Sequence, residues 1–153
     1  DWIESFELTL TAIEKTVLFA EDFEGLALGP NVDETLAGDA VWTDTPPEGW
    51  TVDESGIPGI NMDATDGITE WAGWAFTDKA WWTEAAGDQD RSLFELGSGV
   101  VAVADPDEWD DDERLPIPIA VDPYDTWLTT PEIKIGSAEL CTLEFKFVSC
   151  LRT

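Results

Sequence analysis

Residues 125–148 read DTWLTTPEIKIGSAELCTLEFKFV, and this stretch decides the fold class. Between 141 and 147, apolar residues at the odd positions alternate with polar residues at the even positions. A period of two is typical of a strand with one buried face, so we predict a half-buried strand here, with Cys141 on the core side. A second strand is expected over 127–135, broken or placed at a sheet edge by Pro131.

The two cysteines, Cys141 and Cys150, are nine residues apart in the chain. If the strand ran straight between them, their sulfurs would be ~30 Å apart at ~3.3 Å per residue, which is too far for a disulfide. A bridge requires the chain to turn back near Ser149. We therefore expect a buried free thiol at Cys141.

The rest of the chain also favours short strands. Apolar or alternating runs predict strands over 17–25, 49–52 and 97–104, the last of them fully buried. Residues 29–66 are rich in Gly, Pro, Asn and Asp and predict mostly loops and short strands. In the aromatic segment 70–82, some apolar positions partly fit a helical period and others fit a strand period, so the pattern does not decide between the two. Frequent turn residues and few helix caps together predict an all-β fold, an antiparallel β-sandwich.

Composition sets firm limits on function. The chain has 153 residues, which suits one domain, and 7 Lys+Arg against 34 Asp+Glu give a net charge of −27. With no histidine, catalysis by a Ser-His-Asp or Cys-His arrangement and any His-containing metal site are excluded. The negative field opposes nucleic-acid and anionic-membrane binding. A content of 43% hydrophobic residues with nine tryptophans excludes a disordered acidic tail.

The compartment is inferred from the same numbers. No run of 18 apolar residues is present, and the sequence starts at Asp1 without a leader, so we expect any secretory signal to be removed or not included. Dense carboxylates and only four lysines suit a salt-rich medium that screens self-repulsion. We expect a secreted or cell-surface protein of an extracellular, marine or halophilic setting. An acidic cytosolic protein is the alternative.

Several blocks of sequence resemble one group of secreted bacterial modules. FAEDFEG at 19–25 and PPEGWTV at 46–52 are similar to the "F-x-E-x-F-E … P-x-G-W" opening of MAM-like and cleaved-adhesin (choice-of-anchor) jelly-roll domains. Residues 125–133 are similar to the family's "W-L-x-T/S-P-x-I/L" strand, and 143–147 to its "L-x-F-x-F" strand. Residues 87–107 resemble a subgroup found beside hydrolase domains.

The resemblance implies a jelly-roll β-sandwich over residues 17–153, preceded by a leader strand or linker over 1–16. Such domains continue with further strands after the "L-x-F-x-F" strand. We therefore expect a sandwich that is incomplete at its C-terminal end, its last strands missing or supplied by another chain. An open sheet edge and an exposed core face would be a liability for a lone domain.

The resemblance also implies a structural Ca²⁺ near the first strand. The candidate ligands are Glu21, Asp22, Glu24 and Asp125. Calcium takes six to eight oxygen ligands, which carboxylates and loop carbonyls supply. The alternative is a solvated acidic edge. Two further acidic loops, 105–112 and 61–67, fail the EF-hand pattern and are interpreted as hydrated loops.

Tryptophans supply the candidate ligand site, because sugars stack on indole rings. The candidates are Trp71, Trp74, Trp81, Trp82 and Arg91. The competing interpretation is structural: tryptophan also fills the core of a small sandwich, so we expect most of the four to be buried. The arginine is expected to pair with Asp88 or Asp90 unless it orients an acidic sugar.

The sequence thus predicts a non-catalytic extracellular module that binds glycan or mediates adhesion within a larger secreted protein. The alternative is a structural subunit of an extracellular filament or sheath, completed by strand donation from a neighbouring chain. Its partners are then a polysaccharide or cell-surface glycan, or other protein chains. No phosphate loop, nucleophile elbow or metal-binding cysteine pattern is present, so no enzyme is expected.

Overall fold

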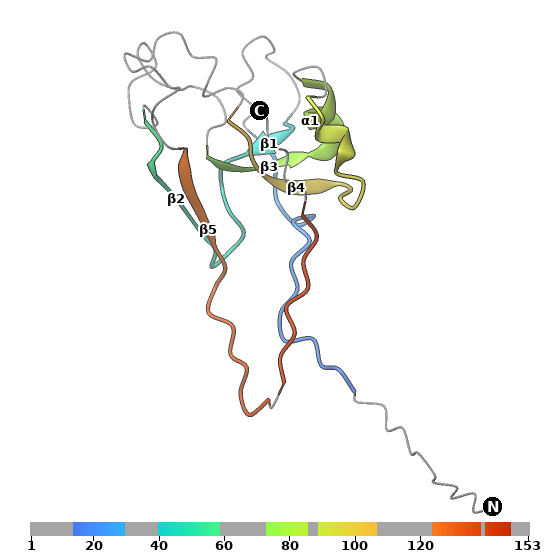
Figure 1. Cartoon of the computed structure of the whole chain (residues 1–153), viewed down its shortest axis with the longest axis vertical. Helices are drawn as coiled ribbons and strands as arrows, with labels where there is room; N and C mark the ends of the chain where they lie inside the picture. Colours follow the sequence, from blue (N-terminus) through green and yellow to red (C-terminus); the bar gives the residue numbers. More distant parts are fainter. Residues whose placement is uncertain are drawn as a thin grey trace, which may run out of the picture.

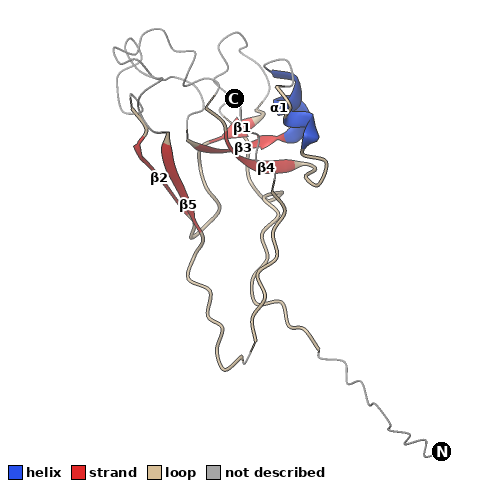
Figure 2. Ribbon diagram, in the orientation of Figure 1, coloured by secondary structure: helices blue, strands red, loops and turns tan. Residues whose placement is uncertain are grey.

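The structure, a computed structural model, describes residues 14–29, 40–58, 73–85, 89–106, 124–138 and 140–147. In chain order the elements are β1 (Trp42–Thr43), β2 (Thr51–Gly56), β3 (Trp74–Asp78), α1 (Lys79–Ala85), the 3₁₀ turn η1 (Arg91–Leu93), β4 (Val100–Ala104) and β5 (Asp125–Thr129). Strands outnumber helices, and every strand pair is antiparallel (Figures 1 and 2). The all-β prediction is confirmed for this part of the chain.

The larger sheet has three strands in the order β1-β3-β4. β3 is central, and its residues Ala75, Phe76 and Thr77 are buried. The Thr77 hydroxyl donates to the carbonyl of Val41 at 3.0 Å, which satisfies a polar group that is shielded from water. A strand buried on both faces shows no alternation of apolar and polar residues, and this explains why its sequence pattern is ambiguous.

One face of this sheet packs against α1. The register places Ala75 opposite Val103, so these side chains share a face, and β4 alternates between buried and partly exposed residues. The core cluster consists of Trp42, Ala75, Trp82, Val101 and Val103. α1 begins directly after β3, where the Trp81 N–H donates to the Asp78 carboxylate at 2.9 Å. The mixed periodicity of 70–82 therefore reflects a strand that becomes a helix at this side-chain cap.

An aromatic chain covers the other face of the larger sheet. The centroid of the Phe23 ring lies 5.3 Å from that of Phe76 in β3 and 5.6 Å from that of Trp50. The Trp50 and Phe19 ring centroids are 6.1 Å apart. Phe23 reaches this position with a left-handed backbone, φ 64°. Two blocks that are more than 20 residues apart in sequence thus pack on one sheet through edge-on and tilted ring contacts.

The smaller sheet pairs β2 with β5, and it stands beside the larger sheet (Figure 1). Asp53 lies opposite Trp127, and an irregularity in the register precedes Gly56. Gly49, with φ 83°, introduces β2, and a Cβ atom added there would lie only 3.2 Å from Pro131. This close approach holds the start of β2 against the end of β5.

β5 continues into a long excursion, residues 130–138 and 140–147, which we call the arm. It extends away from both sheets and turns back at Ile135–Ala138, where the Ala138 N–H donates to the Ile135 carbonyl at 3.1 Å (Figure 1). The returning limb runs beside residues 14–20, and Lys15 Nζ lies 3.6 Å from Glu144 Oε1. Every residue described between 140 and 147 is exposed.

The arm corrects part of the sequence prediction. The expected half-buried strand over 141–147 is absent, and Cys141 is free, as predicted, but exposed rather than buried. The expected strand over 17–25 is also absent, and its end forms a turn. An alternating sequence becomes a half-buried strand only where another layer covers one face, and residues 141–147 are all exposed. Cys150 lies outside them.

Other predictions fare differently. The strand over 97–104 is confirmed as Val100–Ala104, although it is half-buried, and the strand over 49–52 as the longer Thr51–Gly56. The strand over 127–135 ends at Thr129, before the proline. Most of the predicted leader, residues 1–13, lies outside the described ranges. Within those ranges, no helix has the length and apolar composition needed to cross a membrane.

Phe76→Ala tests whether β3 is the centre of the core. The ring is fully buried, so its removal is expected to lower the free energy of unfolding by ~3–5 kcal/mol, measured by chemical denaturation. Leu93→Ala is the control: this side chain is 61% exposed, and its loss is expected to change stability by less than ~0.5 kcal/mol. Equal effects of the two substitutions would contradict this assignment of the core.

Candidate functional site

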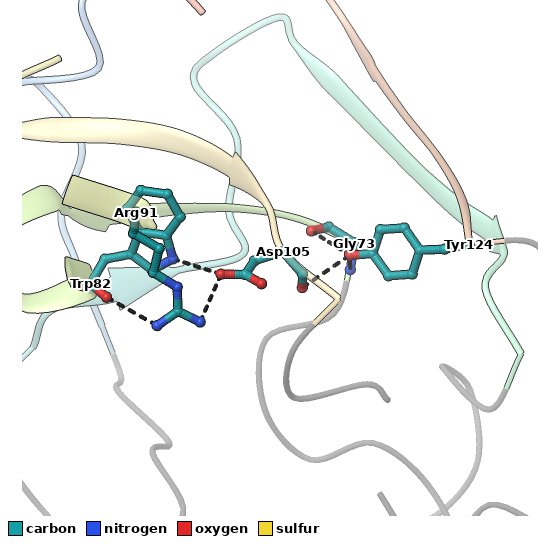
Figure 3. A network of polar contacts seen from close by, with 5 residues as sticks. All are labelled: Gly73, Trp82, Arg91, Asp105 and Tyr124. Carbon is teal, nitrogen blue, oxygen red and sulfur yellow. Dashed lines mark hydrogen bonds and ion pairs between the residues drawn. The ribbon is translucent and has the colours of Figure 1, made fainter. Parts of the chain in front are cut away.

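A buried arginine organises the polar interior of the larger sheet. Arg91 is 4% exposed, and its Nη2 atom lies 2.8 Å from Oδ2 of Asp105, at the end of β4 (Figure 3). Its Nη1 atom donates to the Trp82 carbonyl at 3.1 Å. A buried guanidinium is tolerated only when a carboxylate and further acceptors surround it in this way.

The same carboxylate accepts a hydrogen bond from Trp82, the second of the two tryptophans of α1. Trp82 Nε1 donates to Asp105 Oδ2 at 2.9 Å, and the Arg91 guanidinium lies 5.4 Å from the indole ring. Gln89 and Asp90 hold left-handed backbone conformations, with φ 44° and 67°, as the chain enters η1. A non-glycine residue in the left-handed conformation costs free energy, and the buried contacts of Arg91 offset that cost.

A tyrosine extends the network to the smaller sheet. The Tyr124 hydroxyl, just before β5, accepts from the Gly73 N–H at 2.7 Å and lies 3.2 Å from the Gly73 carbonyl and 3.3 Å from that of Asp105 (Figure 3). Burial raises the pKa of Tyr124, so the hydroxyl stays protonated and keeps its donor. The network therefore ties the starts of β3 and β5 to the end of β4.

Glu54 of β2 is half-buried beside the backbone of Gly73. Burial, and then the negative charge of Asp44, raise the pKa of Glu54 to about 7. A side chain on Gly73, which has φ 74°, would collide with this carboxyl group. Glycine is required here because the backbone must pass close to the carboxyl group.

The sequence-predicted ligand residues do not form one exposed site. Trp82 and Arg91 are buried and contact each other, so they serve the fold, with Asp105 as a partner that the sequence pattern did not indicate. Trp74 and Trp81 are partly buried, on β3 and α1. Trp71 lies outside the described residues, as does Asp88. Of the three rings that are described, one is buried and two are partly buried, so the expectation that most are buried is met only by Trp82.

One tryptophan within the described ranges is exposed, and the sequence analysis did not single it out. Trp127 of β5 is 64% exposed. The residues exposed with it on β2 and β5, which we call the Trp127 face, are Thr51, Asp53, Ser55, Asp125 and Thr129. A signal was present, because the period of two in DTWLT places Asp125, Trp127 and Thr129 on one side of the strand.

Polar residues are the neighbours of Trp127 on this face of the sheet. Asp53 lies directly across the sheet from Trp127, and its Oδ1 atom accepts from the Ser55 hydroxyl at 2.6 Å and the Ser55 N–H at 3.0 Å. These bonds lower the pKa of Asp53, so it is ionised and acts as an acceptor. An apolar ring beside hydroxyls and carboxylates can stack on a flat ligand and bind its hydroxyl groups.

The predicted calcium ligands serve local structure. Glu21 accepts from the Phe23 N–H at 2.7 Å, Asp22 from the Glu24 N–H at 3.1 Å, and Glu24 from the Val100 N–H at 3.2 Å. Asp125 lies in β5, against Gly56. No group of three or more acidic or cysteine side chains arranged to hold a metal occurs in the described parts of the chain. Calcium binding therefore stays a prediction.

We also compared the chain with known proteins. No protein-family model, no curated protein and no solved structure shows significant similarity to it. The function of the chain must therefore be inferred from the residues of the site itself.

Asp105→Asn tests the buried network. The substitution removes the carboxylate charge that lies 2.8 Å from the buried Arg91 guanidinium, and we expect the free energy of unfolding to fall by ~3 kcal/mol in urea denaturation. Glu84→Gln, an exposed change on α1, is the matched control and is expected to have an effect below ~0.5 kcal/mol. An Asp105→Asn protein as stable as the control would show that the ion pair does not support the fold.

Glu54→Gln tests the half-buried carboxyl group. Because its pKa is higher in the folded chain than the ordinary 4.5, protonation stabilises the fold fully below pH 4.5, and this contribution is lost as pH rises through 7. After allowance for partial exposure, we expect the variant to be more stable than the parent by ~1 kcal/mol at pH 8 and similar at pH 4.5. Thermal unfolding at both pH values checks this, and a pH-independent difference would contradict it.

Proposed function

We propose that the chain is a non-catalytic, secreted module of jelly-roll type that binds glycan through the Trp127 face. The observation that carries the proposal is the exposure of Trp127 on a paired strand, beside carboxylate and hydroxyl groups. An indole held on a sheet presents its ring to a ligand with little loss of conformational entropy on binding. Stacking gives affinity, and the surrounding acceptors give orientation.

The charge of the chain narrows the ligand class. Two acceptors on the Trp127 face, Asp53 and Asp125, are acidic, and the chain as a whole has a net charge of −27. An anionic polysaccharide would be repelled by this field, especially at low ionic strength. A neutral polysaccharide avoids that repulsion, and its hydroxyl groups donate to carboxylates. We therefore propose a neutral, hydroxyl-rich glycan as the ligand.

The packing of the sequence blocks supports the jelly-roll part of the proposal. The Phe23 ring from the first block contacts the Trp50 ring from the second, and Gly49 approaches Pro131 from the third. Blocks that define a family by their order are expected to be neighbours in space when they form one core. The resemblance to MAM-like and cleaved-adhesin modules is consistent with such contacts.

A second candidate function, structural assembly through strand donation, is favoured by the arm. Apolar side chains lie exposed on the arm and on the segment beside it: Val17, Leu18, Ile135, Leu140, Leu143, Phe145 and Phe147. Large apolar side chains exposed in this number favour an interaction site. The two functions use different surfaces and are compatible in one adhesive protein.

Trp127→Ala tests the glycan proposal. We expect at least about a tenfold loss of affinity for a neutral polysaccharide, measured as retardation in affinity gels that contain xylan, β-glucan or mannan. Leu93→Ala is the matched control, because it also removes an exposed apolar side chain, and its mobility is expected to be unchanged.

Two outcomes would contradict this proposal. The first is retardation that is equal in the parent and in Trp127→Ala. The second is strong retardation by an anionic polysaccharide such as alginate together with none by the neutral ones. Circular dichroism of each variant separates loss of binding from loss of folding, and an exposed ring is expected to contribute little to stability.

Calcium is tested by thermal unfolding at fixed ionic strength. A specific site predicts a rise in Tm that saturates with added Ca²⁺ and is reversed by a chelator. Asp22→Asn is expected to weaken this response. A rise that does not saturate, or one that sodium chloride reproduces, would instead indicate general screening of the acidic surface.

A further inference from the structure

The returning limb of the arm has the features of an unpaired β-strand. Residues 141–147 alternate apolar and polar side chains, and Leu143 and Phe145 are 78% and 68% exposed. Their backbone forms no hydrogen bond with the other described residues. Free N–H and C=O groups beside exposed apolar side chains are the template onto which another strand adds.

Charge makes the arm different from the rest of the molecule. Residues 131–147 contain two lysines and three acidic residues, so their net charge is −1 in a chain of net charge −27. The arm extends away from both sheets before its second limb returns toward the larger sheet (Figure 1). Two copies can therefore meet at their arms while their acidic bodies stay apart, and the long-range repulsion is reduced further by salt.

The sequence of the limb is complementary to itself. In an antiparallel pair of two identical strands centred on Phe145, Glu144 of each copy lies opposite Lys146 of the other. Leu143 likewise lies opposite Phe147. The pairing thus places two opposite-charge pairs on one face and apolar pairs on the other, which is the arrangement that stabilises antiparallel strands. Such a contact is isologous, so it closes after two copies.

We propose that residues 141–147 are a dimerisation strand, and that its occupant is the same strand of a second copy, paired antiparallel about Phe145. The inference does not rest on glycan binding, since the Trp127 face is on the paired strands β2 and β5 and not on the arm. Dimerisation would place two Trp127 faces in one particle and increase retention on a polymeric glycan through avidity.

Charge reversal tests this pairing. Sedimentation velocity at about 0.15 M salt, where the Debye length is about 8 Å, gives the dissociation constant of the dimer. Glu144→Lys and Lys146→Glu each create like-charge pairs and are expected to raise that constant at least tenfold. The double variant with both changes restores opposite pairs and is expected to return to within about threefold of the parent.

Cross-linking tests the register. In a background with Cys141→Ser and Cys150→Ser, Phe145→Cys places two thiols directly opposite each other, and mild oxidation is expected to give a covalent dimer. Leu143→Cys, which faces Phe147 of the other copy, is the control and is expected to cross-link much less. Both variants keep the sheets and α1 unchanged, so a failure here does not reflect a failure to fold.

The outcomes separate this inference from the glycan proposal. A chain that is monomeric at all concentrations up to about 0.5 mM, or a dimer that the single charge reversals leave unchanged, would overturn the inference. So would equal cross-linking at positions 143 and 145. Binding of the Glu144→Lys monomer to soluble oligosaccharide would still report on Trp127, so either proposal can fail while the other stands.

Discussion

The buried ion pair between Arg91 and Asp105 is the interaction on which the rest of the structure depends. A chain with 34 acidic residues and seven cations places one of those cations in its interior, where it contacts the Asp105 carboxylate, the Trp82 carbonyl and the Trp82 indole ring. The Asp105 carbonyl then contacts Tyr124, which precedes β5. Asp105 thus contacts α1 through Trp82, the η1 turn through Arg91 and the start of β5 through Tyr124, so it links the larger sheet to the strand that presents Trp127.

This arrangement separates the tryptophans into two roles. Trp42 and Trp82 are buried and fill the space between the larger sheet and α1, while Trp127 lies exposed on the smaller sheet. The proposed glycan site is thus built on a rigid, paired strand, whereas the proposed dimerisation strand lies on an arm without a covering layer. One surface is suited to repeated weak contacts with a polymer, and the other to bringing two such surfaces together.

The sequence predicted the strand-rich fold, because alternation and turn residues act over a few neighbouring positions. It did not predict the partner of Arg91, because Asp105 is 14 residues away and only tertiary packing brings it near. The strand expected over 141–147 is absent for a related reason. Alternating apolar and polar residues indicate that a segment is able to form a strand, but the described residues supply no partner strand for it. The period of two in residues 125–129 could have predicted that Trp127 lies on the exposed face of its strand. The cluster of tryptophans at 71–82 gave the more prominent pattern.

The most direct test of the account is an NMR titration of the indole N–H signals with a neutral soluble oligosaccharide. We predict a saturable shift of the Trp127 signal, with the Trp82 signal unchanged because its N–H is bonded to Asp105 inside the fold. Assignment follows from the Trp127→Phe variant, which removes one signal. Saturable shifts at Trp74 or Trp81 with none at Trp127, or no shift at any tryptophan, would contradict the proposed site.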